Sequence, residues 1–327
     1  MSAEGGTKAV VAALTANLAI AVVKFTAWAL TGASSMLAEA IHSVADSGNQ
    51  VLLLVGGRRA KKGVTAEHPF GYGRERYIFG FIVAVVLFSV GGLFALYEAY
   101  HKWHELHEGQ PNELLESAWW WVPLVVLAAA IVAEGLSFRT AVRESNHTRG
   151  EQSWGKFIRS AKAPELPVIL LEDFAALIGL VLALLGVGLT LLTGNGIFDV
   201  LGTALIGLLL VAVAVTLAIE TKSLLLGESA GPESVARIER ALAGTPGVER
   251  IIHMKTLHMG PEEILVAAKI GVQETAQAAE IAATIDRAEV SIRAAEPMVT
   301  SLYLEPDIFR AGYEPAARPE RPGAPAH

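Results

Sequence analysis

The chain of 327 residues is 52% hydrophobic and 18% charged, and its mean hydropathy is +0.44. Because the apolar residues come in long blocks, this composition excludes an ordinary soluble domain and indicates a membrane protein. The chain contains no cysteine, which excludes disulfides and thiolate metal sites and leaves histidine and carboxylate side chains as metal ligands. The formal net charge of −7 is less informative than the distribution of the charges along the chain.

Six apolar blocks are each long enough to cross a bilayer as a helix, which takes about 20 residues. They lie at about 8–30, 34–57, 77–100, 118–138, 166–192 and 197–221. Only TGASS joins the first two blocks, so we expect them to form an antiparallel hairpin. The chain passes from a polar start, MSAEGG, into the first block without a processing site, so we expect no cleaved signal peptide.

The segments between the blocks predict the orientation in the membrane. The segments after the second and fourth blocks, RRAKKGVTAEHPFGYGRERY and FRTAVRESNHTRGEQSWGKFIRSAK, are strongly basic. The other two connections, HKWHELHEGQPNELLES and TGNGIFD, hold a single lysine, Lys102. Basic loops stay on the cytoplasmic side, so we expect both termini in the cytoplasm and the cluster Trp119–Trp121 at the outer interface. We found no transit peptide, and we therefore expect the bacterial inner membrane.

After Leu226 the composition changes to that of a small soluble domain. GPESVARIERALAGTPG has helical spacing, and VERIIHMKTLHM and EEILVAAKIGV predict two strands around a Gly-Pro turn. A helix over TAQAAEIAATIDRAEVSIRAA and a last strand, VTSLYLEP, complete the order αββαβ. We therefore expect a membrane domain of six helices at 1–225, an α+β domain at 226–312 and a disordered Pro-rich tail at 313–327.

Several ionisable side chains fall inside the apolar blocks, where a charged side chain costs at least about 2.5–3.5 kcal/mol. They are Lys24, Glu39, His42, Asp46, Glu134, Glu172 and Asp173. His42 and Asp46 lie one helical turn apart, so both can reach one ion. The fifth block runs in the opposite direction to the second, so Asp173 can reach a comparable depth and complete a zinc site. Hydrogen bonding between helices is the alternative role for all three side chains.

The other intramembrane residues leave more than one role open. Glu172 lies about 100° from Asp173 around the helix, so it is a candidate metal ligand, a partner of a ligand or a proton carrier. Glu134 is a candidate proton carrier or a partner of a buried polar group on a neighbouring helix. Lys24 and Glu39 lie near the outer ends of the first two blocks at matching depths, which predicts an ion pair between these helices.

This set of motifs resembles the cation diffusion facilitator family of metal transporters. The resemblance rests on SSMLAEAIHSVADSGNQVLLL in the second block, EHPFGYGRERY in the following loop, VILLEDFAALIG in the fifth block and a ferredoxin-like tail. It covers about residues 7–308 and is strongest toward the branch that contains mitochondrial zinc transporter-9-like proteins. The resemblance implies a homodimer without a prosthetic group that exports a divalent cation, chiefly zinc, in exchange for protons.

The resemblance also implies a transport site with two ligands from the second span and two from the fifth. The first pair corresponds to His42 and Asp46, and in the fifth span Asp173 and Ile169 occupy the two ligand positions. Since isoleucine cannot bind a metal, either Glu172 or water completes the shell, or the site selects another ion. Carboxylate and water ligands suit manganese or iron, so exporters of these metals are alternatives to a zinc exporter.

Other metal sites of the family are only partly kept. In the loop after the second span, the usual pair of histidines appears as His68 and Tyr72, which leaves His68 as a single candidate ligand. In the C-terminal domain, His253 and His258 are five positions apart and should point to opposite faces of a strand. We therefore expect this domain to act mainly in dimerisation.

The expected mechanism is secondary active transport by alternating access, in which ion binding displaces protons from the ligands. A membrane-bound metal sensor or scaffold without turnover is the competing hypothesis. The sequence has no phosphate-binding loop, nucleophile elbow or aspartyl-phosphate motif, so neither an enzyme nor an ATP-driven pump is expected. The expected partners are the metal ion, protons, membrane lipid and a second copy of the chain, and no nucleic acid.

Overall fold

The computed structural model of the protein describes the backbone of residues 3–312 and the side chains of 17–147 and 149–312. The expected disordered tail at 313–327 lies outside the described residues. The chain forms two compact units. The first ends at Glu228 and takes in His258–Glu262, and the second consists of Ser229–Leu257 and the chain from Glu263 onward.

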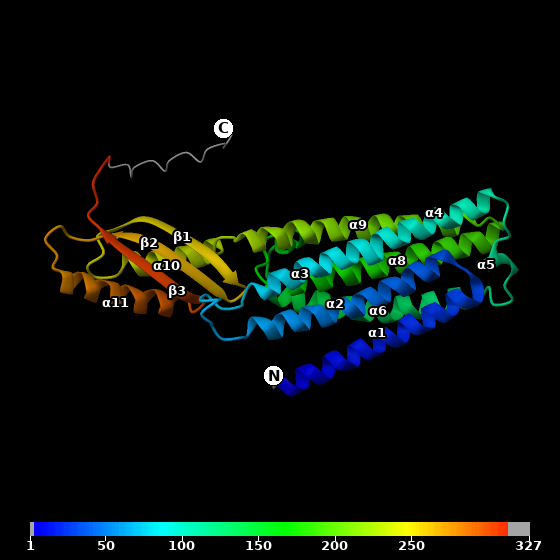
Figure 1. Ribbon diagram of the computed structural model, residues 1–327, viewed down its shortest axis with the longest axis horizontal. Coiled ribbons are helices and arrows are strands. Elements are labelled where there is room, and N and C mark those ends of the chain that lie inside the picture. Colours follow the sequence, from blue (N-terminus) through cyan, green and yellow to red (C-terminus); the bar gives the residue numbers. More distant parts are fainter. Residues whose placement is uncertain (1–2, 313–327) are drawn as a thin grey trace. The chain divides into compact units, whose positions relative to one another are not determined.

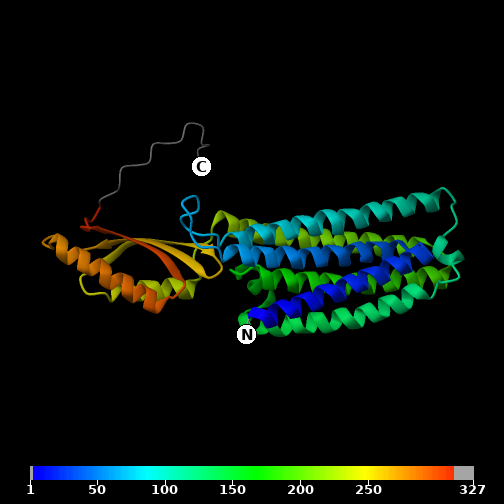
Figure 2. The ribbon, with the colours of Figure 1, turned by 60° about the horizontal axis from the view of Figure 1, so that its bottom comes forward.

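The first unit is a bundle of long helices that lie side by side (Figures 1 and 2). They are α1 (Ala3–Thr31), α2 (Ser34–Ala60), a continuous run of α3 (Glu75–Val86), η1 (Leu87–Leu93) and α4 (Phe94–His107), α6 (Val122–Arg149), α8 (Glu165–Thr193) and α9 (Ile197–Leu226). Short helices α5 (Glu113–Glu116) and α7 (Trp154–Ser160) lie in the connections. All six apolar blocks of the sequence are therefore helical.

Four of the described helical stretches are long and apolar enough by themselves to cross a membrane. They are Glu75–His107, Val122–His147, Glu165–Thr193 and Ile197–Leu226. The described apolar part of α1, Asn17–Thr31, is shorter, and α2 carries more polar residues. Two helices are longer than their apolar blocks, since α4 continues to His107 and α6 to Arg149. Much of the segment expected as a basic loop is thus helical, because the first residue that interrupts it is Gly150, with a φ of +58°.

The predicted hairpin of α1 and α2 is confirmed. A residue of α9 forms hydrogen bonds with the first residues of α2, next to the turn of this hairpin. Gly32 takes a φ of +63° at the turn, a conformation that favours glycine. The carboxylate of Asp199 in α9 accepts hydrogen bonds from the backbone N–H groups of Ser34 at 2.8 Å and Ser35 at 3.4 Å. It also accepts one from the Ser35 hydroxyl at 2.5 Å. A negative charge here satisfies free N–H groups and interacts favourably with the helix dipole.

Close packing of η1 and α4 against α9 depends on two glycines. A Cβ atom at Gly207 would lie 2.8 Å from Cγ and 3.0 Å from the backbone N of Leu96. A Cβ atom at Gly92 would lie 2.7 Å from Cγ2 of Val211. Small residues let helix backbones approach in this way where lipid supplies no hydrophobic driving force between helices.

The second unit has the order αββαβ that the sequence predicts. Its elements are α10 (Pro232–Ala243), β1 (Arg250–Gly260, whose last three residues are grouped with the first unit), β2 (Glu263–Gly271), α11 (Ala278–Ala295) and β3 (Val299–Asp307). The strand order is β1-β2-β3, with β2 and β3 parallel and paired from Leu265 opposite Ser301 to Gly271 opposite Asp307. The parallel pair requires a crossover, which α11 supplies. This arrangement is the ferredoxin-like fold expected for this part of the chain.

Alternate residues of β2 form the core of this unit with the two helices. Ile264, Val266, Ala268 and Ile270 are buried and pack in one cluster with residues of α10 and α11. On β1, His253 is exposed and His258 is buried. The two histidines therefore lie in different environments, as the odd spacing predicts.

An ion pair joins α10 to the residue that follows α11. Nη2 of Arg237 lies 2.5 Å from Oε2 of Glu296, whose side chain is 3% exposed. Burial by itself raises the pKa of Glu296, but hydrogen bonds with Ser234 and Arg237 and the guanidinium charge outweigh it, and the pKa is lowered.

Candidate metal transport site

His42 and Asp46 form the one-turn pair that their spacing predicts. Nε2 of His42 lies 3.5 Å from Oδ2 of Asp46, and the two side chains are 2% and 17% exposed. Among the described residues, three buried atoms of this pair have no hydrogen-bond partner. They are both ring nitrogens of His42 and Oδ1 of Asp46. A buried polar atom without a partner is unfavourable by about 1–3 kcal/mol. These atoms are therefore suited to bind a proton or a cation.

A π-helical segment packs beside His42. A Cβ atom at Gly91 of η1 would lie 3.9 Å from Nδ1 of His42, so this backbone approaches the imidazole closely. π-Helical turns are rare and often lie at functional sites. The sequence analysis did not find this segment, and its only signal is the pair Gly91-Gly92 inside an apolar block.

Asp173 on α8 brings a second carboxylate to the pair. Its Oδ2 accepts a hydrogen bond from Oγ of Ser137 at 2.9 Å, which links α8 to α6. Asp173 lies close enough to His42 and Asp46 to act on both electrostatically. Within the described part of the chain, however, no three His, Asp or Glu side chains form a metal-binding cluster. The structure places Asp173 near the pair without closing a coordination shell.

Glu172 faces α2 and is held by an asparagine. Its Oε1 accepts a hydrogen bond from Nδ2 of Asn49 at 2.7 Å, and both residues are buried. Glu172 also interacts electrostatically with Asp46. This geometry fits a partner of a ligand among the roles left open for Glu172. Asn49 and Ser137 were not identified from the sequence, although Asn49 follows Asp46 by one helical turn.

The expected ion pair between α1 and α2 is confirmed. Nζ of Lys24 lies 3.0 Å from Oε2 of Glu39 and 2.8 Å from Oγ of Ser43. The two charged residues are 1% and 0% exposed. Since Glu39 precedes His42 by one turn, this fixed positive charge lies next to the candidate site.

The remaining candidates differ in their relation to the pair. Glu134 on α6 is partly buried and acts electrostatically on His42. Its role as a proton carrier stays a prediction. Ile169, one turn before Asp173, is 37% exposed. His68 is exposed in the loop between α2 and α3, where its ring packs against Tyr72 with centroids 4.5 Å apart. The structure therefore does not bring His68 together with the candidate ligands on the helices.

The candidate site is strongly acidic. Five carboxylates interact with one another or with His42, against the single ammonium group of Lys24. They are those of Glu39, Asp46, Glu134, Glu172 and Asp173. Carboxyl groups that outnumber the cationic side chains around them favour a cation over an anion.

Residues 10–226 match the family model of the cation efflux transmembrane domain. The chain belongs to the cation diffusion facilitator family. It is therefore an integral membrane protein, and the resemblance read from the sequence is confirmed, including its zinc transporter-9-like branch.

Among curated relatives, the human protein named proton-coupled zinc antiporter SLC30A9, mitochondrial, is 35% identical over 269 residues, 82% of this chain and 46% of that protein. The Xenopus laevis protein of the same name is 34% identical over 273 residues, 83% of this chain and 47% of that protein. The chain thus spans about half the length of these relatives. They are mitochondrial by name, so the bacterial inner membrane stays a prediction.

A solved structure also matches part of the chain. A nickel form of the MamM C-terminal domain aligns with 24% of this chain and 96% of its own, with 19% identity and a TM-score of 0.23.

Proposed function

We propose that the chain carries a divalent cation, zinc, out of the cytoplasm in exchange for protons by alternating access. The pair of His42 and Asp46 carries the proposal, because its ligand atoms lie one turn apart on one helix and three of them have no hydrogen-bond partner among the described residues. Asp173 is proposed as the third ligand. Family membership and the printed name of the zinc antiporters that resemble this chain support the same function.

The chemistry follows from the ligand types. A metal binds deprotonated imidazole and carboxylate, so ion binding on the cytoplasmic side releases protons from the site. After a rearrangement of the helices exposes the site to the other side, protons compete with the ion for the same atoms. Histidine suits this exchange because an imidazole gains and loses its proton near physiological pH. The acidic residues around the pair compensate the charge of a divalent ion inside the bundle.

The missing fourth ligand makes a manganese or iron exporter the second candidate. With Ile169 at a ligand position, the shell holds more oxygen than nitrogen, and oxygen ligands suit these harder ions. A flux series with zinc, manganese, iron, cobalt and cadmium on the wild-type chain and on Ile169→His separates the candidates. We expect zinc to move fastest in both proteins, with a larger preference for zinc in the variant. Faster manganese or iron flux in the wild-type chain would contradict zinc as the substrate.

The test of transport is flux in proteoliposomes that contain the full chain, a zinc indicator and a pH indicator. His42→Ala, Asp46→Ala and Asp173→Ala should each lower zinc flux by about tenfold or more, because each removes a ligand. His101→Ala and Asp286→Ala are matched controls, since both residues are exposed and belong to other helices, α4 and α11. Unchanged flux in the three site variants would remove the proposed site.

The coupling and the sensor hypothesis are tested in the same vesicles. An outwardly directed proton gradient should drive zinc movement, and zinc movement should cause an opposite proton flow. Zinc flux without any proton counterflow would contradict antiport. Zinc binding that depends on His42 but produces no flux would favour a sensor or scaffold.

We also propose the orientation and the dimer. The basic loops should face the cytoplasm of the bacterial inner membrane, and two copies should associate through their ferredoxin-like units. The cysteine-free chain allows single-cysteine labelling at Lys61→Cys and Glu116→Cys, of which only the second should react with an impermeant reagent outside intact cells. The molar mass of the purified protein, corrected for detergent, should be that of two chains, and a mass of one chain would contradict the dimer.

A further inference from the structure

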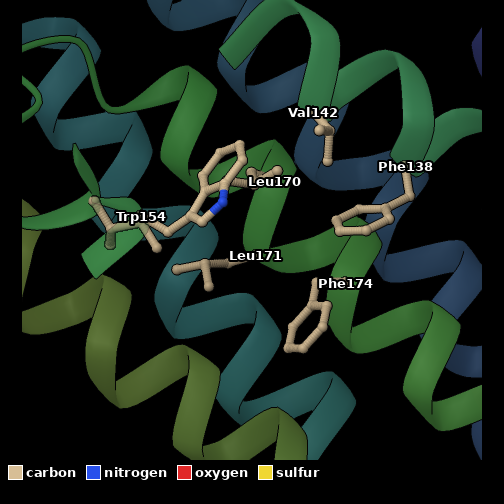
Figure 3. A pocket seen from close by; sticks show the side chains of 7 residues that line it. Phe138, Val142, Trp154, Leu170, Leu171 and Phe174 are labelled. Atoms are coloured by element: carbon tan, nitrogen blue, oxygen red, sulfur yellow. The ribbon is translucent and has the colours of Figure 1, made fainter. Parts of the chain in front are cut away.

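An apolar pocket lies between α6, α7 and α8. Its volume is about 330 Å³, within the range of sites for small molecules. Figure 3 shows the indole of Trp154 and the rings of Phe138 and Phe174 around the same space, with Val142, Leu170 and Leu171. All of these side chains are apolar, so the pocket suits a hydrocarbon chain and not a polar ligand.

The pocket is open toward the outside of the bundle. Trp154 and Phe174 are 38% and 43% exposed, although both line the pocket. The rings of Phe138 and Phe174 lie with their centroids 5.9 Å apart, so they form a wall and leave their outer sides uncovered. In a membrane protein, such a surface is covered by a lipid chain or by another protein.

The depth of the pocket matches the first part of an acyl chain. α8 begins at Glu165, so Leu170 and Phe174 lie roughly 8–14 Å along it at about 1.5 Å per residue. α8 has 29 residues and a length of roughly 44 Å, against a hydrocarbon layer of about 30 Å. For α8 centred in this layer and parallel to its normal, each end extends roughly 7 Å into the headgroup region, which puts the pocket just inside the hydrocarbon.

Basic residues flank the lining residues of this pocket along the chain, and one of them contacts the lining. Arg139 and Arg143 each follow a pocket residue by one position on α6, and both are exposed. The guanidinium of Arg149 lies 4.4 Å from the ring centroid of Trp154. With Lys156 and Arg159, the segment from 138 to 160 has five basic residues and two acidic ones. Arg139, Arg143 and Lys156 form no ion pair within the described part of the chain, so their charges are available to a ligand.

We propose that this pocket binds an anionic phospholipid, with one acyl chain between α6, α7 and α8 and the phosphate on the basic side chains. Each basic side chain near the surface attracts anionic lipid, and a planar guanidinium matches the geometry of a phosphate. A second copy of the chain is a poorer occupant. A symmetric contact through this face would bring the two basic segments against each other.

Trp154 lies inside the proposed site and can report its occupant. In a variant with Trp28, Trp103, Trp119, Trp120 and Trp121 replaced by Phe, Trp154 is the only tryptophan left. This protein is reconstituted in phosphatidylcholine vesicles with one tenth of the lipid carrying bromine on its acyl chains. Brominated phosphatidylglycerol should quench Trp154 at least about fivefold more effectively than brominated phosphatidylcholine at the same fraction.

Charge variants make the test specific to the pocket. Arg139→Gln with Arg143→Gln should remove the preference for phosphatidylglycerol, and both changes are at exposed positions that tolerate substitution. Lys61→Gln with Lys62→Gln removes two basic residues from the other basic loop and should keep the preference. Equal quenching by the two lipids in the parent protein would overturn the proposal. So would weak quenching by both lipids together with cross-linking of two copies at this face.

A second measurement does not depend on replacing tryptophans. Native mass spectrometry of the wild-type chain, released from mixed micelles with equal amounts of the two lipids, should retain phosphatidylglycerol in preference to phosphatidylcholine. The Arg139→Gln, Arg143→Gln protein should lose that preference and the Lys61→Gln, Lys62→Gln protein should keep it. Equal retention by the wild-type chain would overturn the proposal. Neither measurement depends on transport, so each tests lipid binding alone.

Discussion

Replacing Lys24 by methionine tests how strongly the buried ion pair holds α1 to α2. Lys24→Met removes the ammonium that lies 3.0 Å from Oε2 of Glu39. The carboxylate is then left fully buried, since Glu39 is 0% exposed and its Oε1 has no hydrogen-bond partner among the described residues. Methionine keeps most of the volume of lysine, so the variant isolates the charge from the packing.

Breaking a buried pair by removing one partner is unfavourable by about 3–5 kcal/mol. At about 1.4 kcal/mol per factor of ten, this lowers the ratio of folded to unfolded protein by roughly 100-fold to 4,000-fold. Adding Glu39→Gln removes the stranded charge, so Lys24→Met with Glu39→Gln should regain most of the loss. The exposed pair of Arg293 and Glu289, with N and O atoms 2.7 Å apart and side chains 46% and 35% exposed, is the matched control. Removing this pair by Arg293→Met should change the free energy of unfolding by at most about 0.5 kcal/mol.

The free energy of unfolding is measured by denaturant titration in mixed micelles, with tryptophan fluorescence as the signal. A double-mutant cycle of Lys24→Met and Glu39→Gln gives the coupling energy of the pair. We expect a coupling of about 2 kcal/mol or more. Additive effects in the cycle would refute the reasoning, as would a Lys24→Met effect no larger than that of Arg293→Met.

Three further predictions concern contacts elsewhere in the protein. Asp199→Ala should lower the unfolding free energy by about 2 kcal/mol, because the carboxylate caps α2, and a loss under about 0.5 kcal/mol would contradict this. Gly207→Ala should lower the melting temperature, because its Cβ would lie 2.8 Å from Leu96, whereas Gly188→Ala meets no atom within 4 Å and should not; equal shifts would contradict the packing argument. Glu296 has a lowered pKa, so its carboxylate stabilises the folded state above its ordinary pKa of 4.5 and this contribution is lost as pH falls through the lower folded-state value. Glu296→Gln should therefore be less stable than the parent at pH 7 by about 1 kcal/mol and equally stable near pH 3 in thermal unfolding, and a gap independent of pH would contradict this assignment.

Features that depend on local spacing could be predicted from the sequence. Apolar blocks gave the helices of the bundle, and alternation of apolar residues gave the order αββαβ of the second unit. The spacing of four residues between His42 and Asp46 follows directly from the helical period, and their atoms lie 3.5 Å apart in the structure. The pair of Lys24 and Glu39 was also predicted, because a short turn fixes the depths of two neighbouring helices relative to each other. The ends of the helices did not follow from the apolar blocks. A helix can continue past its apolar residues until a residue such as Gly150 interrupts it.

Only the tertiary structure decided which distant residues meet. The hydrogen bond between Asn49 and Glu172 joins positions 123 apart, and the one between Ser34 and Asp199 joins positions 165 apart. The rotation of each helix about its axis determines these contacts, and that rotation depends on packing against every neighbour at once. The pattern of one helix therefore shows which side chains share a face, but packing decides which face of another helix lies opposite.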